Sequence, residues 1–261
     1  MRDQTAAPPR PSALSMSAAL SSRAVRLSSR HVDALVTSLA LPVLLMLLFV
    51  YLFGGAIKTG THHYVTYVVP GVLILCAGFG SAGTAVAVSQ DLTGGIVDRL
   101  RVMDVGGPAF LAGHVVASVI RNAASALLVL GVALLIGFRP HATPLEWAGV
   151  AGILLAFVWA VSWLSAAIGL LTRSPEAANG VAFIVMFLPY ASSAFVPVET
   201  MPSWLQGFAS HQPVTPVIES LRGLLLDTPV GSHPWTALAW CAGILAASIA
   251  ASGYLFARRT S

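Results

Sequence analysis

The feature that most constrains this chain is a series of long apolar stretches without a charged residue. Only 9% of the residues are Asp, Glu, Lys or Arg, and 56% are hydrophobic, whereas soluble domains carry about 25% charged residues. A helix of about 20 apolar residues can cross the hydrocarbon core of a bilayer. Tryptophans and tyrosines tend to lie at the ends of these stretches, as is typical of membrane anchors. The sequence therefore predicts an all-α, polytopic membrane protein.

Six stretches are long enough to be transmembrane helices. They are Ala34–Phe53, Tyr64–Val88, a span within Pro108–Phe138, Trp147–Leu171, Ala178–Val196 and Trp235–Ala257. The third stretch would be roughly 46 Å long as a helix, more than the hydrocarbon core of roughly 30 Å. We therefore expect its first third to protrude from the membrane or to bend. Pro189 predicts a kink in the fifth span.

The segments outside these spans have distinct compositions. Residues 1–15 are rich in Pro, Ala and Ser and are predicted to be a disordered tail. Residues 16–33 carry three arginines on one helical face, which fits an interfacial helix with snorkelling side chains. These arginines are Arg23, Arg26 and Arg30. Residues 34–257 are predicted to form one six-span domain, with residues 258–261 as a short cytoplasmic tail.

The loop over residues 197–234, between the last two spans, contains two short apolar segments. Pro202–Ser210 and Pro216–Leu226 each open with a proline, which suits the first turn of a helix. Both segments are too short to cross a bilayer. We expect two short extracellular helices that dip into the interface or pack on the bundle.

The distribution of basic residues predicts the orientation of the spans, because Lys and Arg are biased toward cytoplasmic loops. With the N-terminus inside, ten arginines lie on the cytoplasmic side and three basic residues on the other side. The cytoplasmic group is Arg2, Arg10, Arg23, Arg26, Arg30, Arg99, Arg101, Arg173, Arg258 and Arg259; the opposite group is Lys58, Arg139 and Arg222. Both termini are therefore predicted to be cytoplasmic. The net charge of +4 is interpreted as orienting the spans, with no nucleic-acid partner.

The most informative segment is the cytoplasmic loop after the second span, residues 89–107. Val97 and Leu100 share one face of a short helix, while charged side chains mark the other face. These charged residues are Asp98, Arg99 and Arg101. A solvated loop with ordinary ion pairs and a docking surface for a cytoplasmic partner both fit this composition.

Four segments in a fixed order resemble the membrane subunit of type-2 ABC transporters, in particular the permeases of daunorubicin and doxorubicin resistance. They are Asp91–Gly95 with Asp98–Arg101, Leu111–His114, Phe195–Leu205 and Gln212–Gly223. The resemblance covers nearly the whole chain after Ser15. The chain departs from the family at Asp104, where a proline is usual, and this carboxylate changes how the loop ends.

The resemblance implies an export permease that pairs with a second permease subunit, as a homodimer or heterodimer, and with a separate cytoplasmic ABC ATPase. That ATPase would bind ATP and Mg, and no cofactor or metal is expected on this chain. The coupling loop would contact the ATPase through Asp91, Gly94, Gly95, Asp98, Arg99, Leu100 and Arg101. The implied substrate is a hydrophobic or amphiphilic drug or antibiotic, exported across the bacterial plasma membrane. A lipid or lipid-linked glycan is the alternative substrate.

Charged residues of the loop 197–234 are either ordinary solvated groups or part of an outer gate. In the second case Glu219 and Arg222 would pair at i,i+3. The candidate gate residues are Glu199, Pro202, Trp204, Glu219 and Arg222.

The chain lacks the phosphate loop that an ATPase needs, Gly-x-x-x-x-Gly-Lys-Ser/Thr. Its single lysine, Lys58, precedes Thr59, but Leu52 and Ile57 occupy the two glycine positions. ATP hydrolysis is therefore expected on another chain. A membrane scaffold without transport activity would have no ATPase partner at all.

Polar residues inside the spans suggest two further roles. Arg121, in the third span, lies about 26 Å from Phe138 at helical rise, which favours anchoring at the inner interface over substrate binding. Ser81 could serve as the nucleophile of an intramembrane hydrolase, but no span places a histidine as its base. Small residues in spans more often permit close helix packing. Cys76 and Cys241 both lie in spans without metal-site spacing, and we predict that both are buried and free.

Overall fold

The structure is a computed structural model and describes residues 32–55, 64–94 and 107–260. Within these ranges all regular elements are helices, so the all-α prediction is confirmed for the described part of the chain. The elements are α2 (Val32–Leu48), the π-helix η1 (Phe49–Phe53), α3 (Tyr64–Thr93), α5 (Gly107–Leu135), α6 (Pro144–Leu171), α7 (Pro175–Met186), the 3₁₀ helices η2 (Leu188–Ala191) and η3 (Val198–Thr200), α8 (Ser203–His211), α9 (Val214–Leu226) and α10 (His233–Thr260). The predicted tail and the predicted interfacial helix up to His31 lie outside the described residues.

Four of the described helices are long and apolar enough to cross a membrane. They are Tyr64–Thr93, Phe110–Leu135, Pro144–Leu171 and His233–Phe256, which correspond to the predicted second, third, fourth and sixth spans. The third is one uninterrupted helix of 29 residues from Gly107. Helix α3 continues to Thr93, so the first five residues of the predicted loop 89–107 are helical instead. The first predicted span coincides with α2 and η1, of which Ala40–Phe53 is a shorter apolar helix.

The prediction of a single kinked helix over Ala178–Val196 is wrong. Helix α7 has 12 residues and stops at Met186, a length of about 18 Å. Pro189 lies in η2 instead of in a helical kink, because proline lacks an N–H and disfavours helix at the residue before it. Ser192 then donates a hydrogen bond to the Pro189 carbonyl and accepts one from the Ala194 N–H. These local bonds replace the helical ones, and the chain turns.

Helices α6 and α7 begin where the sequence supplies capping residues. The Thr143 hydroxyl accepts a hydrogen bond from the Glu146 N–H, and the Glu146 carboxylate accepts one from the Thr143 N–H. This reciprocal capping box, with Pro144 in the first turn, satisfies amides that a helix start leaves unpaired. Ser174 caps α7 through one hydrogen bond, which its hydroxyl accepts from the Ala177 N–H.

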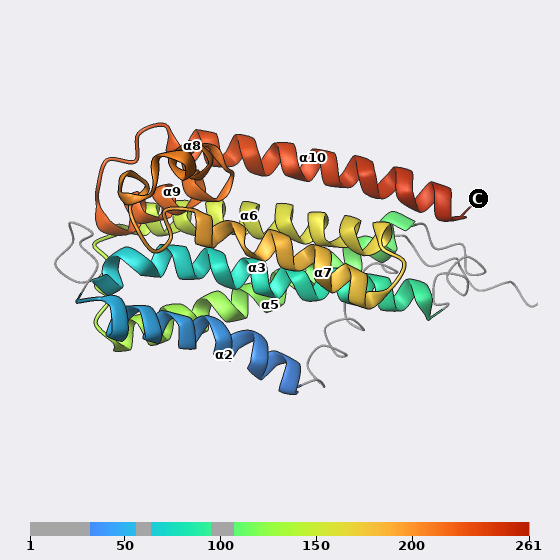
Figure 1. Ribbon diagram of the computed structural model, residues 1–261, viewed down its shortest axis with the longest axis horizontal. Coiled ribbons are helices and arrows are strands. Elements are labelled where there is room, and N and C mark those ends of the chain that lie inside the picture. Colours follow the sequence, from blue (N-terminus) through green and yellow to red (C-terminus); the bar gives the residue numbers. More distant parts are fainter. Residues whose placement is uncertain (1–31, 56–63, 95–106, 261) are drawn as a thin grey trace, which may run out of the picture.

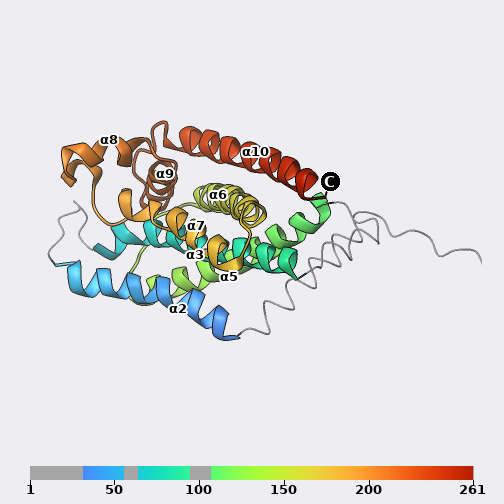
Figure 2. The ribbon, with the colours of Figure 1, turned by 45° about the vertical axis from the view of Figure 1, so that its right-hand side comes forward.

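The long helices lie side by side around α3, which contacts α2, α5, α6, α7 and α9 (Figure 1). Helix α10 packs along α6 and against α9. The short helices α8 and α9 gather at one end of the bundle, away from the C-terminus (Figure 2). We call this the cap end and the opposite end, where α10 finishes, the tail end. The largest buried apolar cluster includes most α3 residues from Tyr64 to Ala77, together with residues of α6 and α9. A smaller cluster toward the tail end consists of Val88, Phe110, Leu111, Val115, Ala166 and Leu170.

Large apolar side chains also cover the outside of the bundle. Leu135 is 86% exposed, Leu145 82% and Trp235 77%. A monomer in water rarely exposes wide apolar patches. The surface therefore fits the lipid environment that the apolar helices imply.

Candidate functional site

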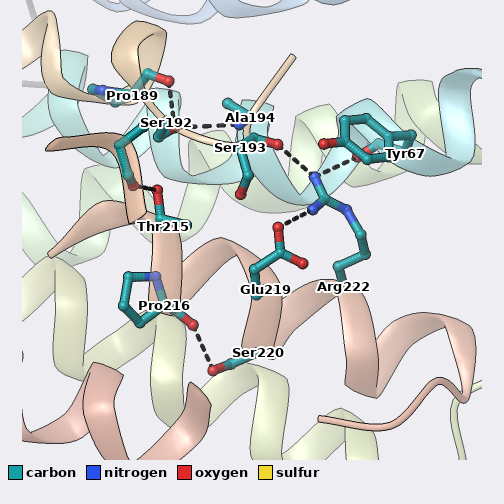
Figure 3. A network of polar contacts seen from close by, with 11 residues as sticks. Tyr67, Pro189, Ser192, Ser193, Ala194, Thr215, Pro216, Glu219, Ser220 and Arg222 are labelled. Atoms are coloured by element: carbon teal, nitrogen blue, oxygen red, sulfur yellow. Dashed lines mark hydrogen bonds and ion pairs between the residues drawn. The ribbon is translucent and has the colours of Figure 1, made fainter. Parts of the chain in front are cut away.

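Arg222 is the centre of a polar network at the cap end (Figure 3). Its Nη2 donates hydrogen bonds to the carbonyl oxygens of Tyr67, at 3.2 Å, and Ser193, at 2.7 Å. Its Nη1 donates to Glu219 Oε1 at 2.5 Å, and Glu219 lies one turn before Arg222 on α9. The guanidinium carbon also lies 3.8 Å from the centroid of the Tyr67 ring. We call Tyr67, Ser193, Glu219 and Arg222 the cap network.

The cap network explains how a charged residue is accommodated inside the bundle. Arg222 is only 8% exposed, and a buried charge is costly unless it is paired and hydrogen-bonded. A carboxylate, two carbonyl oxygens and an aromatic face compensate it, although its Nε has no partner among the described residues. The result is that α9 is fixed both to α3 and to the turn before η3.

Two further side chains fasten the turn over residues 188–195. The Tyr64 hydroxyl donates to the Phe195 carbonyl at 2.8 Å. The Gln212 amide donates to the carbonyl oxygens of Leu188 and Ala191 at 3.2 and 3.1 Å. Neither Tyr64 nor Gln212 was among the predicted gate residues. Their partners lie 131 residues away for Tyr64 and 21 and 24 residues away for Gln212, and no local sequence pattern predicts such contacts.

A second polar group connects three helices inside the bundle. Asn122 Nδ2 donates to Ser81 Oγ at 3.3 Å and to the Ser118 carbonyl at 3.0 Å. Ser162 Oγ donates to Ser118 Oγ at 2.9 Å and lies 3.4 Å from Ser81 Oγ. All four side chains are buried, and we call them the central polar cluster. Hydrogen bonds of this kind hold helices together in membranes at about 0.6–2 kcal/mol each.

The central polar cluster does not form a hydrolytic site around Ser81. The hydroxyl of Ser81 contacts Asn122 and Ser162, neither of which can act as a general base at neutral pH. In the part of the chain that the structure describes, no histidine is hydrogen-bonded to Ser81.

Arg121 lies beside this cluster, at the midpoint of α5. Its Nη2 donates to Thr84 Oγ1 at 3.1 Å and to the Gly80 carbonyl at 3.4 Å, both on α3. The side chain therefore turns toward the neighbouring helix instead of extending along its own. Gly80 permits the close packing of α3 against Asn122 of α5, because a Cβ atom there would lie 2.1 Å from Asn122 Oδ1.

At the tail end, Asp91 and His114 bring α3 and α5 together. His114 Nε2 lies 3.2 Å from Asp91 Oδ2. Helix α3 ends two residues after Asp91, and the Gly94 N–H then donates to the Gln90 carbonyl. The remaining predicted coupling residues, Gly95, Asp98, Arg99, Leu100 and Arg101, lie outside the described residues, as do Arg23, Arg26 and Arg30.

Comparison with known proteins identifies the family. Residues 17–226, most of the chain, match the ABC-2 type transporter family. The chain belongs to this family. It is 32% identical over 195 residues to the daunorubicin resistance ABC transporter permease protein DrrB1 of Streptomyces coeruleorubidus, across 74% of this chain and 69% of the relative. It is 28% identical over 220 residues to the probable doxorubicin resistance ABC transporter permease protein DrrC of Mycobacterium tuberculosis, across 83% and 79%. The predicted resemblance is thereby confirmed.

Within this ABC-2 chain, the predicted gate residues separate into two groups. Glu219 and Arg222 form the predicted i,i+3 ion pair. Trp204 is 79% exposed, and Pro202 and Glu199 are exposed as well; no described side-chain hydrogen bond or ion pair joins these three to the cap network. The gate role of all five residues stays a prediction, as does the location of Arg121 at the inner interface.

Proposed function

We propose that this ABC-2 chain is the permease subunit of an ATP-driven exporter, and that it moves a hydrophobic or amphiphilic compound of the drug or antibiotic class out across the bacterial plasma membrane. The match to the family over residues 17–226 carries the proposal. The four long apolar helices support a membrane subunit. Both relatives are named as permeases of daunorubicin or doxorubicin resistance, which supports this substrate class over a lipid.

The proposed topology has six membrane passages with both termini in the cytoplasm. Helix α7 is too short to cross the ~30 Å core alone, so the fifth passage would be completed by η2 and the turn that follows. The cap end would then face outside, and its short helices α8 and α9 would cover the outer end of the bundle.

The cap network would act as the outer gate in this topology. Arg222 of α9 hydrogen-bonds to the Tyr67 carbonyl of α3, so a movement of α9 relative to α3 that opened a path to the outside would break this bond. Binding and hydrolysis of ATP by the partner would shift the balance between closed and open arrangements. Two permease chains, identical or different, and two ATPase chains would complete the transporter.

The partner proposal is tested by affinity purification of the permease in mild detergent from its own host, followed by an ATP hydrolysis assay. We expect recovery of an ATP-binding-cassette protein whose hydrolysis is stimulated by daunorubicin. A purified permease that brings down no such ATPase, from membranes where both proteins are present, would contradict the proposal and favour a scaffold.

A further inference from the structure

The contact between His114 and Asp91 lies at the base of the predicted coupling loop. Asp91 is in the last turn of α3, and His114 is in the second turn of α5. The contact therefore joins the two helices on either side of residues 95–106. The side chains of His114 and Asp91 are only 14% and 27% exposed.

The surroundings of His114 are those of a fixed contact and not of a solvated surface pair. The Phe110 ring packs edge-on against the imidazole, with centroids 4.9 Å apart. Phe110 belongs to the buried apolar cluster with Val88 and Leu111. Exposed ion pairs contribute about 0–1 kcal/mol because water screens them, whereas polar contacts in an apolar environment are stronger.

A second polar contact joins the same two helices deeper in the bundle, between Arg121 and Thr84. His114 and Arg121 are seven residues apart on α5, and so are Thr84 and Asp91 on α3. Seven residues are about two helical turns, so both contacts lie on the same faces in one antiparallel register. The central polar cluster then continues the connection through Asn122 to Ser162 on α6.

We infer that His114 is a positioning residue for energy coupling, which holds Asp91 so that α3 and α5 move as one unit when the coupling loop is displaced. Without this contact, the two helix ends can separate and absorb the displacement. With it, the displacement reaches the central polar cluster. Packed side chains, hydrogen-bond networks and rigid helices can carry coupling between distant sites. The inference rests on the proposed function, since it needs an ATPase that acts on this loop.

The decisive quantity is the amount of daunorubicin transported per ATP hydrolysed by the permease–ATPase complex in proteoliposomes. For His114→Ala we expect this ratio to fall about fivefold or more, the lower range of coupling effects, while the ATPase stays bound and still hydrolyses ATP. His114→Gln, which retains an N–H donor for Asp91, should keep most of the ratio. His141→Ala is the matched control, because His141 is an exposed histidine at the cap end, and it should leave the ratio unchanged.

A purely stabilising contact predicts a different result. In that case His114→Ala would lower thermal stability but leave the ratio at the wild-type value, which would overturn the inference. If His114→Ala does not assemble, the exchanged pair Asp91→His with His114→Asp decides. If the exchanged protein transports more daunorubicin per ATP than the Asp91→Asn variant, the inference is supported. If it transports the same amount or less, the inference is overturned. Absence of a bound ATPase in the wild type would instead contradict the proposed function.

Discussion

Replacing Arg222 with methionine should loosen the packing of α9 at the cap end. Methionine keeps much of the apolar length but removes the charge and all donors. The Ser193 carbonyl then loses its 2.7 Å partner in a buried turn, and an unsatisfied buried group costs about 1–3 kcal/mol. The stacking on Tyr67 accounts for about 0.5–2 kcal/mol more. The Tyr67 carbonyl lies within a helix, and Glu219 is partly exposed, so their losses are smaller.

These contributions predict a destabilisation of about 3 kcal/mol. The roughly 3–5 kcal/mol for removing one partner of a fully buried ion pair is an upper range here, because Glu219 is partly exposed. For a chain of this size, each 1 kcal/mol lowers the melting temperature by about 2–4 °C. We therefore expect a decrease of about 6–12 °C. Cys76 and Cys241 are free and buried, so a thiol-reactive dye can report unfolding of the detergent-purified protein.

The matched control is Arg139→Met, at an exposed arginine whose hydrogen bonds among the described residues go to carbonyls of its own helix end and turn. Its melting temperature should stay close to that of the wild type. Arg222→Lys should be intermediate, because an ammonium group keeps the charge but loses the planar fork. An Arg222→Met protein that melts within about 2 °C of the wild type, less than 1 kcal/mol, would refute the reasoning.

Three further pairs of substitutions test local features by the same melting assay. Gly80→Ala should destabilise the protein by about 1–3 kcal/mol through overpacking, since its Cβ would meet Asn122. Gly83→Ala should be neutral or stabilising, because its Cβ would have nothing within 4 Å. Equal effects of the two substitutions would contradict the close packing of Gly80 against Asn122. Thr143→Ala should cost about 1 kcal/mol by removing the α6 cap, and Thr143→Ser should restore it; a silent alanine variant would show that the cap is dispensable. Asp227 has φ of 52°, so Asp227→Gly should stabilise by a few tenths of a kcal/mol and Asp227→Val should destabilise; the opposite order would argue against the left-handed turn.

The sequence predicted what depends on local pattern. Charge-free stretches located α3, α6 and α10, and prolines located the starts of α8 and α9 to within two residues. The Glu219–Arg222 pair was visible because both residues lie on one helix at i,i+3 spacing. The segment Thr143-Pro144-Leu145-Glu146 carries a capping signal, which would have moved the expected start of the fourth span to Pro144.

What the sequence could not predict depends on contacts between distant residues. Arg222 and the Tyr67 carbonyl are 155 residues apart, and no periodicity links them. The end of α7 depends on how Ser192 bonds its neighbouring backbone, whereas the stretch without a charged residue continues to Val196. The contact of His114 with Asp91 required the register of two antiparallel helices, which span lengths alone do not give.

The central claim is that this chain moves a compound across a membrane at the expense of ATP hydrolysed by another protein. It is tested most directly in inverted membrane vesicles that contain the permease and its ATPase, with daunorubicin uptake followed by fluorescence. We predict uptake that requires ATP, stops with a non-hydrolysable analogue and is absent when either protein is omitted. ATP-dependent uptake that persists without the permease, or no uptake with both proteins assembled and ATP hydrolysed, would contradict the account.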